Sequence, residues 1–329
     1  MTIHVRAPGR VNLIGEHTDY TGGLVLPMTI DRWTEIRVSP ADNITLRSDH
    51  DQQPAVLDLE IDDLQRVEPQ WAKYVAGVVA EMHPSVGIQG TVTTTIPIGA
   101  GLSSSAALEV AVALALGYNG DALGLAQLCR RAEMHASGVP CGIMDQLSVA
   151  AGIAGHALLI DCGDLTIEPV NIPDDVEIVV QFIAHRTLVG SSYADRVAEC
   201  AQAEALIGPL RTATIDDLLS IPDAIVRARA LHVISENQRV REFSAALQTG
   251  DLTAAGELMV ASHHSLRDLY EISTPVMDAA VEHLIDQPGV YGARMTGGGF
   301  GGSVVALTEP GAITDGWVVR AVAGASRVE

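Results

Sequence analysis

Residues 95–113 read TIPIGAGLSSSAALEVAVA and bring three kinds of backbone into immediate succession. The Thr-rich segment 91–96 has the β-branched composition that is typical of a strand. Two glycines, Gly99 and Gly101, then open the backbone for a tight turn. The Ala-, Leu- and Val-rich run that follows predicts a helix that continues to about Leu116. The stretch therefore predicts a strand, a glycine turn and the N-terminus of a helix.

This arrangement suits an anion. The first N–H groups of a helix are unpaired, its dipole favours negative charge, and glycines let such groups approach a ligand closely. The hydroxyls of Ser103, Ser104 and Ser105 could cap the helix, bind phosphate oxygens or ligate a metal. A capped, buried helix after a turn is the alternative interpretation. The stretch is not a P-loop, because that motif needs Gly-Lys-Ser/Thr and the single lysine of the chain is Lys73.

Composition limits the class of protein. A chain of 329 residues is long enough for two domains, and 47% hydrophobic residues allow sizeable cores. A formal net charge of −21 argues against nucleic acid or an anionic membrane as a partner, and every apolar run is too short to span a bilayer. The four cysteines show neither CxxC nor zinc spacing, which predicts free thiols in a reducing compartment. We expect a soluble, cytoplasmic protein.

A second segment, residues 9–27, reads GRVNLIGEHTDYTGGLVLP and carries many hydrogen-bonding side chains between glycines. It fits neither helix nor strand well, and the strand predicted over residues 3–7 is expected to end at Pro8-Gly9. Because buried polar groups need partners, such a loop fits recognition of a hydroxyl-rich ligand. An ordinary polar surface loop is the alternative.

Asp145 stands inside the otherwise apolar run 141–152, CGIMDQLSVAAG. A carboxylate in such surroundings needs partners or becomes protonated. One interpretation is a helix-capping residue next to Gly142. In the other, a helix begins here and its N-terminus keeps the carboxylate ionised, as a proton acceptor requires.

Hydrophobic periodicity and turn residues predict the remaining elements. Further strands are expected at 24–30, 34–39, 43–47, 156–161, 176–184, 317–321 and after the glycines of 292–302. Helices are expected at 71–82, 121–137, 214–220, 222–247, 251–269 and 275–286, and segment 185–203 is expected to pass from strand into helix. The acidic turn near Pro173 is the predicted domain boundary.

Three motifs together resemble the GHMP family of small-molecule kinases: GRVNLIGEHTDY at 9–20, PIGAGLSSSAALE at 97–109 and GARMTGGGFGG at 292–302. The resemblance covers nearly the whole chain, and the first motif is similar to that of the branch that phosphorylates galactose. It implies a mixed α/β fold of α+β type, with a phosphate-loop domain over 1–173 and a ferredoxin-like domain over 174–329. The active site would lie in the cleft between these domains.

The resemblance also implies a role for each matching residue. Asp145 would accept the proton of the attacking sugar hydroxyl, and Arg10 would stabilise the oxyanion and the transferred phosphoryl group. Whether Asp145 is a true general base or mainly positions the hydroxyl stays open. The implied sugar-binding residues are Glu16, His17, Thr18, Asp19, Gly142 and Tyr193. The ATP phosphates would be held by Gly99, Ala100, Gly101, Leu102, Ser103, Ser104 and Ser105, and Mg²⁺ by Ser105 and Glu133.

The implied activity is Mg²⁺-dependent transfer of the ATP γ-phosphate to the anomeric 1-OH of α-D-galactose by a monomer that binds neither nucleic acid nor membrane. A kinase for N-acetylgalactosamine, arabinose or a uronic acid is one alternative, and a non-catalytic sugar and ATP sensor is another. The sequence departs from the family near both of its ends, among other positions. It starts a few residues before the first motif, without the usual N-terminal extension, and 308–316 is too short for the usual helix before the last strand, which implies a trimmed C-terminal domain.

Overall fold

The computed structural model describes residues 2–185 and 192–328. Its strands are β1 (Ile3–Asn12), β2 (Leu24–Val25), β3 (Pro27–Ala41), β4 (Ile44–Ser48), β5 (Ala55–Leu57), β6 (Gly87–Thr94), β7 (His156–Asp161), β8 (Thr166–Asn171), β9 (Glu177–Ala184), β10 (Val290–Thr296), β11 (Gly302–Thr308), β12 (Trp317–Val319) and β13 (Ser326–Arg327). Its helices are α1 (Ala72–Met82), α2 (Ser104–Ala115), α3 (Ala122–Ser137), α4 (Met144–Ala151), α5 (Tyr193–Ile207), α6 (Ala224–Thr249), α7 (Leu252–Asp268) and α8 (Pro275–Ile285), with 3₁₀ helices η1 (Asp19–Thr21), η2 (Leu64–Arg66) and η3 (Asp216–Ser220).

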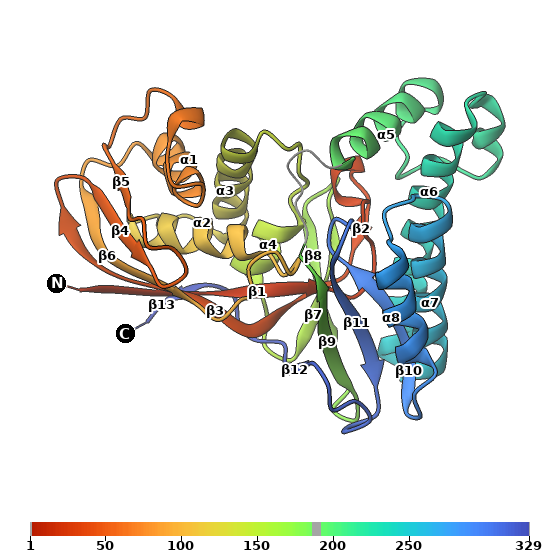
Figure 1. Ribbon diagram of the computed structural model, residues 1–329. Coiled ribbons are helices and arrows are strands. Elements are labelled where there is room, and N and C mark those ends of the chain that lie inside the picture. The colour runs from red at the N-terminus through yellow and green to blue at the C-terminus, as the bar shows by residue number, and fades with distance from the viewer. Residues whose placement is uncertain (1, 186–191, 329) are drawn as a thin grey trace.

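A six-stranded sheet in the order β13-β1-β3-β6-β4-β5 forms the base of the first half of the molecule. Helices α1, α2 and α4 pack on one face of this sheet, and α3 packs on these helices (Figure 1). The strands obey the alternation of a half-buried sheet: in β3, Ile36 and Val38 are buried whereas Arg37 is exposed. The mixed α/β architecture implied by the resemblance is therefore confirmed.

Strand β1 is longer than the sequence predicted. It runs through Pro8-Gly9 to Asn12, with a bulge between Pro8 and Gly9, and pairs with β3 on both sides of that bulge. The prediction that it ends at Pro8-Gly9 is wrong, because the bulge accommodates the proline without ending the ladder. A Cβ atom on Gly9 would lie 2.9 Å from Leu102 O, so the glycine lets β1 pack directly against the start of α2.

The strand–turn–helix prediction is confirmed, with β6 ending at Thr94 and α2 beginning at Ser104. We call residues 97–103 between them the glycine–serine loop. The segment between β1 and β2, residues 13–23, is called the polar loop. Strands expected at 24–30 and 34–39 are instead the short β2 and one long strand, β3.

The second half contains a four-stranded antiparallel sheet in the order β10-β11-β9-β12, the strand order of a ferredoxin-like domain. Helices α7 and α8 pack on β10. The described residues 309–316 connect β11 to β12 without a helix, as their length predicted. Strand β13 then returns to the first sheet, where Arg327 pairs with Val5, so the two ends of the described chain lie on the same side of the molecule (Figure 1).

A third sheet has the order β2-β7-β8, and its strand β8 was not predicted. The turn near Pro173 follows β8, and the domain boundary placed there stays a prediction. Segment 185–203 was predicted to pass from strand into helix. Its residues 186–191 lie outside the described part of the chain. The cysteines are free thiols, as expected. Among the described residues, every helix is too short or too polar to cross a bilayer.

Candidate active site

A cavity of about 670 Å³ opens between elements of the two halves of the chain. Its size is that of a small-molecule site. Its wall includes Arg10 of β1, Glu133 of α3, Asp145 of α4, Tyr193 of α5 and Gly298 from the loop after β10. Residues that are far apart in the sequence therefore face one space.

Arg10 and Asp145 form an ion pair on the cavity wall. Arg10 Nε and Nη2 both donate to Asp145 Oδ1, at 2.8 and 2.5 Å. Arg10 Nη1 donates to Gly101 O at 2.6 Å, which ties the pair to the glycine–serine loop. The Arg10 side chain is 2% exposed and that of Asp145 is 26% exposed. The carboxylate therefore meets the cavity while the guanidinium supports it from within the protein.

Asp145 is the second residue of α4, which begins after Ile143. Of the two interpretations of this residue, the structure supports the one in which a helix begins here, and the helix N-terminus favours the negative charge. Ser103 Oγ donates to Asp145 Oδ2 at 2.6 Å, so each carboxylate oxygen has a partner. Ser103 occupies the N-cap position of α2, but its hydroxyl donates to Asp145 and does not cap that helix.

The glycine–serine loop is built from left-handed backbone. Gly99, Gly101 and Ser103 have φ angles of 76°, 80° and 60°. Glycine adopts this region freely, whereas a serine does so at a cost in conformational energy. The left-handed backbone of Ser103 directs its hydroxyl toward Asp145 of α4. Ser303 Oγ at the start of β11 donates to Ala100 O at 2.8 Å, so the second half of the chain also holds this loop.

Glu16, His17 and Asp19 line the cavity from the polar loop. Burial raises the pKa of Asp19 from 3.8 to about 7, and the nearby carboxylates of Asp145 and Glu16 add to this shift. A Cβ atom on Gly142 would lie 1.9 Å from Asp19 Oδ2, so glycine is required for the observed contact. Asp19 and Gly142 meet although they lie 123 positions apart in the sequence.

His17 is held in a chain of aromatic residues. Its backbone is left-handed, with φ 62°, and its Nδ1 lies 2.8 Å from the hydroxyl of Tyr20. That hydroxyl lies 2.5 Å from the hydroxyl of Tyr270. The His17 ring also packs on Tyr193, with 5.2 Å between ring centroids. The structure thus brings together the predicted His17 and Tyr193.

Glu133 and Ser105 are adjacent, with Ser105 Oγ donating to Glu133 Oε1 at 2.8 Å. Gln146 Nε2 donates to Glu133 and, at 3.2 Å, to Glu109 Oε2. Burial raises the pKa of Glu109 well above 4.5, and the charge of Glu133 adds to the shift. Within residues 2–185 and 192–328, His, Cys, Asp and Glu form no group of three or more that could hold a metal ion. The pair offers one carboxylate and one hydroxyl to the cavity.

Thr18, Ala100 and Leu102, which the resemblance assigned to ligands, are buried behind the cavity wall. Thr18 Oγ1 donates to Leu24 O at 2.6 Å, so its hydroxyl fixes the polar loop. The N–H of Ala100 donates to Pro97 O at 3.3 Å, which closes the turn before the helix. Internal hydrogen bonds thus occupy the Thr18 hydroxyl and the Ala100 amide, and the Leu102 side chain packs in the core. The ligand-binding roles of these three residues stay predictions.

The cavity also reaches residues that the sequence analysis missed. Trp71 at the N-cap of α1, Tyr74 within α1 and His50 after β4 line it. Aromatic residues make up 4% of the chain, so two of them three residues apart at a helix start were an available signal. Nothing in the local pattern connected them to the glycine–serine loop.

Comparison with known proteins gives three matching family models. The first is described as the galactokinase galactose-binding signature and matches residues 2–40. The GHMP kinase N-terminal domain matches residues 71–153, and the GHMP kinase C-terminal domain matches residues 243–315.

Curated relatives match along most of their length. The galactokinase of Bos taurus is 43% identical over 94% of this chain and 84% of its own length. The galactokinase of Chloroflexus aggregans is 44% identical over 97% of this chain and 87% of its own length. Among solved structures, Lactococcus lactis galactokinase complexed with galactose superposes with a TM-score of 0.92 and 31% identity, covering 99% of this chain and 95% of that one.

Proposed function

The chain belongs to the galactokinase family of GHMP kinases, and we propose that it transfers the γ-phosphate of ATP to the anomeric 1-OH of α-D-galactose. The products are galactose 1-phosphate and ADP. The observation that carries this proposal is the Arg10–Asp145 pair, which shares one cavity with Glu16 and Asp19. Phosphorylation of a sugar needs an acceptor for a hydroxyl proton, a cation for developing charge and acceptors for the other hydroxyls.

In the reaction, the 1-OH oxygen bonds to the γ-phosphorus while the bond from that phosphorus to the bridging oxygen of ADP breaks. Asp145 receives the proton of the 1-OH. Because Arg10 and Ser103 already hydrogen-bond its two oxygens, the carboxylate is fixed in direction before the sugar arrives. Arg10 stabilises charge on the attacking oxygen and on the phosphoryl group.

ATP is the phosphate donor, as in the kinase family to which the chain belongs. In our proposal the amides and hydroxyls of the loop from Gly99 to Ser105 hold its phosphates at the N-terminus of α2. Where the cavity reaches α1, the ring of Trp71 offers an apolar face for the nucleobase.

Mg²⁺ is the cofactor that we propose for Ser105 and Glu133. A carboxylate and a hydroxyl in contact, at the edge of a phosphate site, match the oxygen ligands that Mg²⁺ prefers when it also binds a nucleotide. The ion supplies charge neutralisation for the phosphates. Gln146 supports the Glu133 carboxylate from behind, and it also donates to Glu109, whose pKa burial raises well above its usual range.

The sugar hydroxyls are assigned to Glu16, His17, Asp19, Tyr193 and the backbone of Gly142. An ionised Asp19 can accept from two adjacent hydroxyls, and a sugar epimer that cannot supply both would leave it unpaired. We infer that Asp19 discriminates between galactose and its epimers.

A sugar panel tests the proposal. Purified protein is incubated with ATP and with galactose, glucose, N-acetylgalactosamine, arabinose or galacturonic acid, with and without Mg²⁺, and ADP release and the sugar phosphate are measured. We expect the highest kcat/KM for galactose and a requirement for Mg²⁺. A higher kcat/KM for another sugar would reassign the substrate, and galactose binding without turnover would support the sensor alternative.

A further inference from the structure

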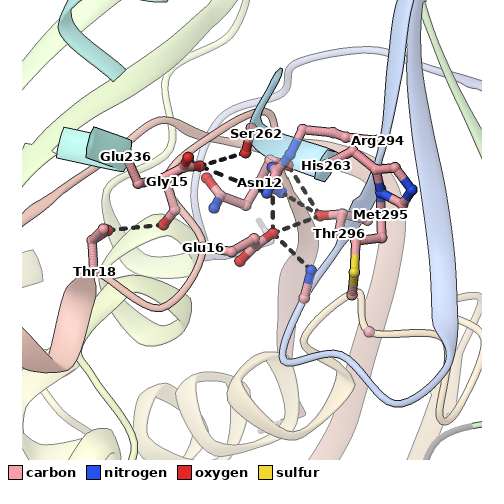
Figure 2. A network of polar contacts seen from close by, with 12 residues as sticks. Asn12, Gly15, Glu16, Thr18, Glu236, Ser262, His263, Arg294, Met295 and Thr296 are labelled. Atoms are coloured by element: carbon pink, nitrogen blue, oxygen red, sulfur yellow. Dashed lines mark hydrogen bonds and ion pairs between the residues drawn. The ribbon is translucent and has the colours of Figure 1, made fainter. Parts of the chain in front are cut away.

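Glu16 lines the cavity, yet its side chain is only 2% exposed because the C-terminal half of the chain binds one of its oxygens. Glu16 Oε1 accepts from Gly297 N at 2.7 Å, and it lies 3.2 Å from Thr296 Oγ1, whose single proton it shares with Asn12 O at 3.0 Å. Arg294 Nη1 lies 3.6 Å from the same oxygen. Figure 2 shows these groups, from the end of β10 and the loop after it, converging on Glu16.

A second buried carboxylate, Glu236 of α6, holds the backbone beside Glu16. Glu236 Oε1 accepts from Gly15 N at 3.0 Å and from Ser262 Oγ at 2.6 Å (Figure 2). Burial acts to raise its pKa, but cations, Arg239 above all, hold the pKa of Glu236 at about 2. The carboxylate is therefore charged at neutral pH and anchors the polar loop next to the residue that we assign to the sugar.

Arg294 lies between the two carboxylates and is fully buried. Its Nη2 is 4.0 Å from Glu236 Oε1, and its Nη1 donates to Asn12 O at 3.3 Å. Within the described residues, its Nε and Nη2 have no hydrogen-bond partner, so it acts on the carboxylates mainly through its charge. The site therefore places one buried cation between two buried carboxylates.

We propose that Arg294, Thr296 and Glu236 are positioning residues that present Glu16 to the sugar. Glu16 Oε1 makes the contacts with described residues given above. Glu16 Oε2 is the oxygen that we assign to a sugar hydroxyl. A free glutamate side chain would lose rotamer freedom on binding, whereas one that is already fixed loses little. This inference deepens the function proposed above and rests on it.

Thr296 gives the cleanest test, because its replacement removes a hydroxyl without leaving a buried charge. Thr296→Val is compared with Thr296→Ser, which keeps the hydroxyl, and with Thr308→Val as the matched control. Thr308 is also fully buried, but it lies at the far end of the neighbouring strand, where its hydroxyl donates to Glu309 O at 2.9 Å.

We expect Thr296→Val to raise the KM for galactose about fivefold, the scale of one lost hydrogen bond. The KM for ATP and the melting temperature relative to Thr308→Val are expected to stay unchanged. Thr296→Ser is expected to behave as the wild type. A general packing defect would move both KM values and the melting temperature together.

Deoxygalactoses can identify the galactose hydroxyl that binds to Glu16. The ratio of kcat/KM between wild type and Thr296→Val is measured with galactose and with each of the 2-, 3-, 4- and 6-deoxy sugars. We expect the ratio to fall to about one for a single deoxy sugar, because the hydroxyl that Glu16 binds is then absent. Arg294→Lys, which keeps the charge but changes its reach, is expected to lose its own galactose penalty with the same deoxy sugar.

The outcomes separate this inference from the function beneath it. Wild-type protein without galactose turnover would overturn both. Normal turnover by the wild type, together with a Thr296→Val protein that matches Thr308→Val in its KM for galactose, would overturn the inference alone. So would a Thr296→Val penalty that persists unchanged with every deoxy sugar.

Discussion

Oδ2 of Asp19 lies 1.9 Å from the place that a Cβ atom on Gly142 would occupy. The polar loop and the segment before α4 therefore meet at a point where only a hydrogen atom fits. The contact sets Asp19 beside Asp145, the carboxylate that faces the cavity, and it makes a specific substitution informative.

Gly142→Ala is expected to displace Asp19 and to raise the KM for galactose by tenfold or more, since two overlapping heavy atoms cannot both stay in place. The KM for ATP is expected to change less than twofold. Steady-state kinetics with each substrate varied in turn measures both values. Gly250→Ala is the control for stability, because that glycine ends α6 with open space for a Cβ atom but a left-handed φ of 73°, so its substitution strains the backbone away from the cavity. An unchanged galactose KM in Gly142→Ala would show that the Asp19 contact is irrelevant to binding.

We expect Asp19 to make sugar binding depend on pH. Its pKa is raised to about 7, chiefly by burial, so in the free enzyme the carboxylate becomes protonated as the pH falls through 7. The charged form is the better acceptor for hydroxyls, and kcat/KM for galactose is therefore expected to fall between pH 8 and pH 6. In Asp19→Asn this inflection is expected to vanish, and kcat/KM is expected to be low throughout. An inflection near 7 that survives in Asp19→Asn would assign it to another group.

The same shift links Asp19 to stability. A carboxyl group whose folded-state pKa lies above its unfolded value of 3.8 binds more protons in the folded state, so the free energy of unfolding falls as the pH rises from about 4 to about 7. Asp19→Asn has no carboxyl group to titrate and lacks this loss of stability. The melting temperature of Asp19→Asn minus that of the wild type is therefore expected to be larger at pH 8 than at pH 5. Thermal unfolding at the two pH values measures it.

Glu133→Gln is expected to weaken the binding of the Mg²⁺–ATP complex by tenfold or more, because it removes the carboxylate that we assign to the ion. Calorimetry compares ATP binding with Mg²⁺ and with EDTA, and the variant is expected to lose the difference between them. Glu81→Gln is the control, since Glu81 pairs with Arg131 on the helix surfaces. A Glu133→Gln protein that keeps the full Mg²⁺ effect would place the ion elsewhere.

Trp71→Ala is expected to raise the KM for ATP about tenfold, the scale of one lost aromatic stacking contact, and to leave the KM for galactose unchanged. Trp33→Ala is the matched control, because Trp33 packs under the guanidinium of Arg6. Fluorescence titration with ATP provides a second measurement. Equal effects of the two substitutions would exclude a specific role for Trp71.

Much of this site could be predicted where chemistry is local in the sequence. The glycines and serines of 99–105 indicated a helix N-terminus, and the apolar run around Asp145 indicated that a charged residue there needs partners. The structure supplies those partners, Arg10 and Ser103. The predicted end of β1 is wrong because a Pro-Gly pair usually ends a strand, and a bulge cannot be predicted from composition.

The support behind Glu16 could not be predicted in the same way. Its partners Thr296 and Gly297 lie 280 and 281 residues further along the chain, in a segment whose glycines indicated only a close approach to something. Likewise, the serine at position 103 satisfied the pattern of a helix cap, but its left-handed backbone turned the hydroxyl toward Asp145. Contacts of this kind depend on the register between elements and not on any local pattern.

In the proposed reaction Asp145 receives the proton of the sugar 1-OH, and the kcat of Asp145→Asn for galactose 1-phosphate formation is the sharpest test of this role. We expect kcat to fall by roughly a hundred- to ten-thousandfold, the range of general base catalysis, while calorimetry shows galactose binding within a few-fold of the wild type. Asp268→Asn, at an exposed carboxyl group paired with Arg267, is expected to keep full activity. A folded Asp145→Asn protein whose kcat stays within tenfold of the wild type would show that Asp145 does not receive the proton of the 1-OH.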